Sequence, residues 1–144
     1  MNYYKNILCA IDLDANSVKI IQTALAVTGN DPAIIHVVHT CEHPITGYGE
    51  LTGSNHQITE TQIRQKTYPE LCAVLEKVNI PKGQGHIIFG PPAEGVHKLA
   101  KELNCDLIVV GSHGKSGLRL LFGSTSNSVL HGAQCDVLTV RIED

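Results

Sequence analysis

The segment DLIVVGSHGKSGLRLLFGST, residues 106–125, begins with a short apolar run and continues at once into a glycine-rich stretch. An uninterrupted run of leucine and β-branched residues is typical of a parallel strand that is buried on both faces. The glycines after it let backbone N–H groups approach a ligand closely, and Gly123-Ser124-Thr125 predicts a helix start with unpaired N–H donors. The segment therefore predicts a strand, an anion-binding turn and a helix, in that order.

Five apolar runs of this kind divide the chain, and helical patterns lie between them. The runs cover residues 6–11, 33–39, 86–89, 106–110 and 136–142. Apolar residues three and four apart predict helices over residues 15–27, 59–78, 94–103 and 124–130. Pro69 should kink the second helix or start its main segment, and residues 41–58 predict a long loop. The alternation predicts one α/β domain, residues 1–144, with a doubly wound parallel sheet.

The composition excludes several classes of function. The chain has 144 residues, of which 42% are apolar and 17% charged, so it can form a folded core. A net charge of −3 argues against a nucleic-acid-binding surface and against a polybasic membrane anchor. Five dispersed cysteines without a C-x-x-C pair are typical of reduced thiols, so we expect a cytoplasmic protein. Cys9 and Cys105 are expected to pack as small hydrophobic residues.

The carboxyl ends of the predicted strands form the edge at which such a sheet binds ligands. Asp12 follows the first strand, and the glycine-rich segment follows the fourth. Two familiar phosphate loops are excluded by single positions. Val109 occupies the first glycine position of G-x-x-x-x-G-K-[ST], and the turn at residues 12–16 contains no glycine for a dinucleotide-binding G-x-G-x-x-G. No nucleophile motif such as G-x-S-x-G is present either.

Six short motifs, in order along the whole chain, resemble those of the universal stress protein family. The first strand ends in Ala10-Ile11-Asp12, the second reads Ile34-Ile35-His36-Val37, and Gly90-Pro91-Pro92 follows the third. The sequence VVGSHG at residues 109–114 precedes Gly123-Ser124, and the last strand contains CDVL at 135–138 with Val140-Arg141. Each motif is weak alone, but their order makes the resemblance specific.

The resemblance implies a five-stranded sheet in the order 3-2-1-4-5, with helices on both faces, in a chain that is usually a homodimer. It implies a bound ATP or AMP, with Mg²⁺ as the companion of ATP. Asp12 and the backbone at Val37 would hold the adenosine portion, with Val110 beside it. The complete nucleotide-binding set that we expect is Ala10, Asp12, Val37, Val110, Gly111, His113, Gly114, Gly123, Ser124 and Thr125. The implied function is that of a stress-response sensor or regulator, with no catalytic residue assigned and at most slow ATP hydrolysis.

Two departures from the family pattern keep a second function open. Eight residues separate Gly114 from Gly123 where the family has nine, and Asp14 stands where a serine is usual. The alternative is a dimeric interaction module that binds protein partners and no nucleotide. In either case, the apolar last strand would form an exposed sheet edge at which two copies can pair.

Each candidate residue also has a purely structural interpretation. The glycines could serve only as tight turns, Asp12 could cap the first helix, and Lys115 and Arg119 could be solvated surface charges. His36, His39, Cys41 and His43 are residue types that bind metals. However, His36 and His39 are an odd number of residues apart, so they face opposite sides of a strand. We therefore expect no metal site.

Overall fold

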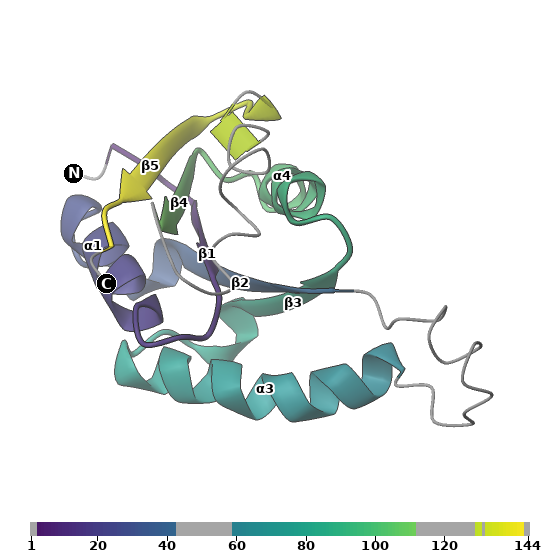
Figure 1. Cartoon of the computed structure of the whole chain (residues 1–144). Helices are drawn as coiled ribbons and strands as arrows, with labels where there is room; N and C mark the ends of the chain where they lie inside the picture. The colour runs from purple at the N-terminus through teal and green to yellow at the C-terminus, as the bar shows by residue number, and fades with distance from the viewer. Residues whose placement is uncertain (1–2, 43–58, 112–128, 131, 143–144) are drawn as a thin grey trace.

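The computed structural model describes residues 3–42, 59–111, 129–130 and 132–142. Five strands form one parallel sheet in the order β3-β2-β1-β4-β5 (Figure 1). The strands are β1 (Ile7–Ile11), β2 (Ile35–Cys41), β3 (Gly85–Phe89), β4 (Leu107–Gly111) and β5 (Asp136–Val140). The fold class and the strand order are thus confirmed.

Three helices are described, and their bounds lie within two residues of the predicted ones. They are α1 (Ser17–Val27), α3 (Glu60–Lys77) and α4 (Pro92–Glu102). The helix α3 begins at Glu60, behind a capping box formed by Thr59 and Gln62, and runs through Pro69. Pro69 therefore does not start the main segment. Its side chain is exposed, so water can reach the carbonyl that the missing N–H leaves unpaired.

The second strand begins two residues later than predicted, because a short 3₁₀ turn, η1 (Pro32–Ile34), precedes it. The Asp31 side chain accepts a hydrogen bond from the Ala33 N–H and so stabilises the turn. A second 3₁₀ turn, η2 (Lys82–Gln84), leads into β3 in the same way. Of the loop predicted at residues 41–58, residues 43–58 lie outside the described part of the chain. Of the helix predicted at residues 124–130, only Val129 and Leu130 are described.

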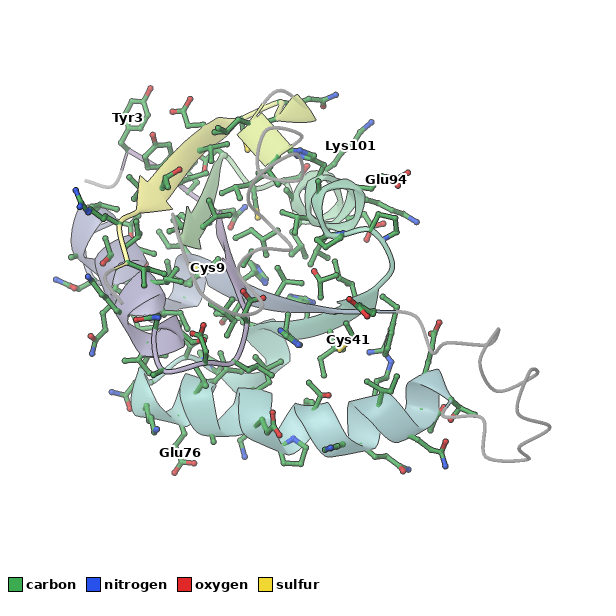
Figure 2. The ribbon with its side chains drawn as sticks, viewed as in Figure 1. Tyr3, Cys9, Cys41, Glu76, Glu94 and Lys101 are labelled. Carbon is green, nitrogen blue, oxygen red and sulfur yellow. The ribbon has the colours of Figure 1, made fainter. Side chains whose placement is uncertain are left out.

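The sheet is covered by α1 and α3 on one face and by α4 on the other (Figure 1). Alternate residues of β1 enter different cores: Ile7, Cys9 and Ile11 pack toward α1 and α3, and Leu8 and Ala10 pack toward α4. All five are buried, as a central parallel strand requires. Cys9 lies in this interior, whereas Glu76 and Lys101 point outward from α3 and α4 (Figure 2).

The cysteines pack as the sequence predicts. Cys9 is fully buried, and Cys105 packs against the core on the α4 side. Burial raises the pKa of the Cys105 thiol to about 12, so this thiol is neutral at physiological pH. No helix in the described part of the chain is long and apolar enough to cross a membrane.

The winding of the chain reverses beside β1. The connections from β1 through α1 and from β2 through α3 step outward to β3, and α4 then returns the chain to β4 on the other side of β1. The carboxyl ends of β1 and β4 therefore lie side by side where the winding reverses, which is where ligands bind in open α/β sheets. The opposite end of these strands is fixed by Asp106, whose carboxylate accepts hydrogen bonds from the Lys5 and Asn6 N–H groups at 2.9–3.2 Å.

The last residue of β4, Gly111, has a packing role in addition to the ligand-binding one expected for it. A Cβ atom at this position would overlap with Ile142 Cδ1 and lie 3.0 Å from Ile20 Cδ1, and both isoleucines are buried. A residue with a Cβ atom here would force the buried Ile142 and Ile20 side chains to shift.

We predict that Gly111→Ala lowers the free energy of unfolding by about 1–3 kcal/mol, the usual cost of overpacking a core. Gly83→Ala is the matched control, because a Cβ atom there would meet nothing within 4 Å. Urea unfolding of both variants checks the prediction. Equal stabilities for the two variants would show that the core at Gly111 yields without cost.

Candidate functional site

The predicted site residues of β1 and β4 lie close together, at the place beside β1 where the winding of the chain reverses. Asp12 directly follows β1, and Gly111 ends β4. Cys9 pairs with Val109, so Ala10 and Val110, one residue further along each strand, are neighbours on the α4 face. Residues predicted from two distant parts of the sequence therefore meet at one edge of the sheet.

Val37 lies deeper in the sheet than the other predicted residues. It pairs with Cys9 on one side and with Gly85 on the other, and its side chain is fully buried. The strand β2 continues for four residues beyond it, to Cys41. The carboxyl end of β2 is therefore formed by His39, Thr40 and Cys41.

Of the residues expected to lie near the phosphates, all but Gly111 fall outside the described part of the chain. They are His113, Gly114, Gly123, Ser124 and Thr125, together with the neighbouring charges Lys115 and Arg119. The residues expected to hold the adenosine portion are described, and the nucleotide-binding role of both groups stays a prediction.

Asp12 does not cap the first helix. The N-cap of α1 is Asn16, which makes no side-chain capping bond, and the turn before it is held by Asp14, whose Oδ1 accepts from the Asn16 N–H at 2.9 Å. Asp12 Oδ2 is buried and has no hydrogen-bond partner among the described residues. The structural interpretation of Asp12 as a helix cap is thus wrong, and its carboxyl group is left with an unused acceptor.

The surroundings of Asp12 disfavour its charge. Burial, and to a lesser extent the nearby Asp14 carboxylate, raise the pKa of Asp12 to about 6. A second buried oxygen without a partner in the described structure, Ser17 Oγ, lies at the first residue of α1. Unpaired buried oxygens are rare in folded proteins because each costs free energy, and the connection from β1 into α1 contains two of them.

The backbone between β1 and α1 is strained as well. Leu13 has a φ of 60°, in the left-handed region that residues other than glycine seldom adopt. Strain of this kind persists where the surrounding structure enforces it, and it is concentrated at functional sites. Leu13 directly follows Asp12, so this conformation sets the direction in which the backbone leaves β1 toward α1.

His39 belongs to the same edge, although the sequence pattern indicated only a metal interpretation for it. Its Nδ1–H donates to the Ile11 carbonyl at 2.9 Å, beside Asp12. In a neutral imidazole this leaves Nε2 as an acceptor. The signal that could have found His39 was its position at the end of the second strand, next in the sheet to the first.

A cation lies at the carboxyl end of the neighbouring strand, and sequence reasoning missed it too. Arg64 of α3 donates to the Ile87 carbonyl at 3.1 Å, and its guanidinium lies 5.1 Å from the centre of the Phe89 ring. The contact joins residues 23 positions apart, so no local pattern could have revealed it.

A cavity of about 560 Å³ opens at the other end of the sheet, lined by residues of α4 and by the starts of β4 and β5, including Lys98, Lys101, Cys105 and Cys135. None of the predicted site residues is among the described residues that line it. It is therefore separate from the edge that carries Asp12.

Comparison with known proteins gives a consistent result. The model of the universal stress protein family matches residues 3–141. Two proteins of Coxiella burnetii are similar over nearly their whole length: universal stress protein A homolog 1 is 40% identical over 147 residues, and homolog 2 is 37% identical over 145 residues. In both alignments 99% of this chain and 99% of the relative are covered.

Solved structures with the same fold include two that contain nucleotides. A universal stress protein in complex with cAMP is 20% identical, with a TM-score of 0.66 over 96% of this chain and 97% of that one. The universal stress protein from Archaeoglobus fulgidus in complex with dAMP is 17% identical, with a TM-score of 0.57 over 97% of this chain and 99% of that one. The strand order, the motifs at the strand ends and the matched length lead to one conclusion: this chain belongs to the universal stress protein family.

Proposed function

We propose that the chain binds an adenine nucleotide, ATP or AMP, at the edge where β1 and β4 end, and that it acts through this ligand as a sensor or regulator in a stress response. The adenosine portion lies against Asp12, Val110 and the backbone at Val37 in β2. The phosphates lie against the glycine-rich segment after β4, which includes Gly111, Gly114, Gly123, Ser124 and Thr125.

The observation that carries the proposal is the buried, unpartnered Oδ2 of Asp12. A carboxylate only accepts hydrogen bonds, so its partner must bring O–H or N–H donors. Ribose hydroxyl groups are such donors, and a phosphate group is not. Asp12 therefore fits the sugar of a nucleotide, and the backbone donors expected after β4 fit its phosphates.

The comparisons support the adenine nucleotide as the ligand class. The two solved complexes contain cAMP and dAMP, which share the adenine base, the sugar ring and one phosphate. Among the described residues, no group of three or more His, Cys, Asp or Glu side chains is arranged to hold a metal ion. In the proposal, Mg²⁺ enters with ATP, held by its phosphate oxygens.

The proposal also includes a homodimer. The strand β5 pairs with β4 on one side, and Val137 and Leu138 pack against the two cores. Its other edge can extend the sheet through a second copy of the chain.

We predict that protein stripped of ligand binds AMP or ATP in calorimetry, and that Asp12→Asn weakens binding by roughly 10- to 100-fold, the loss typical of a charged hydrogen-bond partner. Asp14→Asn is the matched control, since it removes the same charge without removing the unpartnered carboxylate. No binding of either nucleotide at millimolar concentration would overturn the proposal and favour the interaction module.

The same variant should be more stable than the natural protein when no ligand is present. The folded pKa of Asp12, about 6, lies above the unfolded value of about 3.9, so folding is opposed by the charged form. The ionised Asp12 carboxylate lowers the free energy of unfolding by its full amount above about pH 6, and this destabilisation disappears as the pH falls below about 4. Asp12→Asn should therefore raise the urea midpoint at pH 7.5 and leave it unchanged near pH 3.5. A variant that is less stable at pH 7.5 would show that Asp12 has a structural role.

Sedimentation equilibrium tests the dimer. We expect twice the chain mass of 15.6 kDa at micromolar concentration, with or without nucleotide. A monomer under these conditions would remove the β5 pairing from the proposal and leave the nucleotide site untouched.

A further inference from the structure

A second group of side chains that can bind a ligand lies at the opposite end of the sheet and consists of two histidines. His36 is the second residue of β2, and His86 is the second residue of β3, on neighbouring parallel strands (Figure 1). Each lies two residues before an apolar residue, Val38 or Ile88, that packs toward α4, so both imidazoles are on the α4 face. Neither belongs to the edge that carries Asp12.

The two rings meet through their nitrogens. His36 Nδ1 and His86 Nε2 are 3.1 Å apart, and the ring centres are 5.2 Å apart. Only one hydrogen can lie between the facing nitrogens, so one ring donates and the other accepts. Both side chains are half-buried, and burial lowers the pKa of each. The pair is therefore neutral at physiological pH, which is the state in which imidazole binds metals.

The spacing of the two nitrogens matches that of two ligands on one metal ion. Metal–nitrogen bonds of about 2.0–2.1 Å to atoms 3.1 Å apart enclose an angle of roughly 95–102°. This angle lies between those of octahedral and tetrahedral coordination. Replacing the shared hydrogen by a metal ion needs one ring to change its tautomer and both rings to turn toward a common point, while the strands keep their positions.

We propose that His36 and His86 form a binding site for one divalent transition-metal ion of the imidazole-preferring class, such as Zn²⁺. The described residues supply no third His, Cys, Asp or Glu ligand, so water fills the other positions. The pair supplies two of the four ligands of a closed structural zinc site, and about half of the binding free energy of such a site corresponds to a Zn²⁺ dissociation constant of roughly 1–200 μM.

A metal ion at this place would cross-link the sheet edge. The strand β3 is the outermost strand and pairs with β2 among the described strands. An ion held by one histidine from each strand binds the folded protein and not the unfolded chain, so it raises stability by mass action. Sequence reasoning rejected a shared metal for His36 and His39, and the structure supplies a different partner, 50 residues away.

The test is a Zn²⁺ titration of metal-free, nucleotide-free protein by calorimetry at pH 7.5. We expect His36→Gln and His86→Gln each to weaken Zn²⁺ binding by at least about tenfold, since each removes one of two ligands. His97→Gln is the matched control, because His97 lies on α4 and lines the separate cavity. Equal Zn²⁺ affinity in the natural protein and in both histidine variants would overturn the proposal.

A measurement on the natural sequence keeps the test independent of how the variants fold. Zn²⁺ should shift the ¹⁵N resonances of His36 Nδ1 and His86 Nε2 together, and it should raise the thermal unfolding midpoint. Shifts confined to other histidines, or none at 1 mM Zn²⁺, about fivefold above the weakest expected dissociation constant, would contradict the assignment. Because no nucleotide is present, failure here leaves the Asp12 proposal unaffected.

Discussion

The structure depends on the central position of β1, which pairs in parallel with β2 on one side and with β4 on the other. This double pairing buries all five residues of the strand and forces the chain to change the direction of its winding. Because the chain winds outward to β3 on one side of β1 and returns to β4 on the other, the carboxyl ends of β1 and β4 lie side by side at the switch point of the sheet. The topology alone therefore makes this edge the expected place for a ligand, before any side chain is considered.

Asp12 gives that edge its chemistry. Its side chain is half-buried near Asp14, its pKa is raised to about 6, and its buried Oδ2 has no partner in the described structure. These features lower the free energy of unfolding of the ligand-free protein. Asp12 does not offset this loss by capping α1, because the N-cap of that helix is Asn16. A binding site explains them together, since a ligand with hydroxyl donors would complete the hydrogen bonding of the carboxylate.

The sequence allows the fold to be predicted well and the site only in part. Uninterrupted apolar runs and three- and four-residue spacings are local signals, so every described strand and helix lies within two residues of its prediction. Contacts between distant segments leave no such signal. The His36–His86 pair, the bond from His39 to Ile11 and the Arg64–Phe89 contact depend on strand register and helix placement. Gly111 shows a further limit, because its packing against Ile20 and Ile142 is not visible in a glycine-rich motif.

The most direct measurement is the NMR titration of the Asp12 carboxyl carbon, in ligand-free protein and in protein saturated with AMP. We expect a pKa of about 6 for Asp12 without ligand and a clearly lower value with AMP, because hydrogen bonds from the ribose would stabilise the carboxylate. An Asp12 pKa that AMP leaves unchanged, at concentrations where AMP is bound, would place the nucleotide elsewhere and contradict the account.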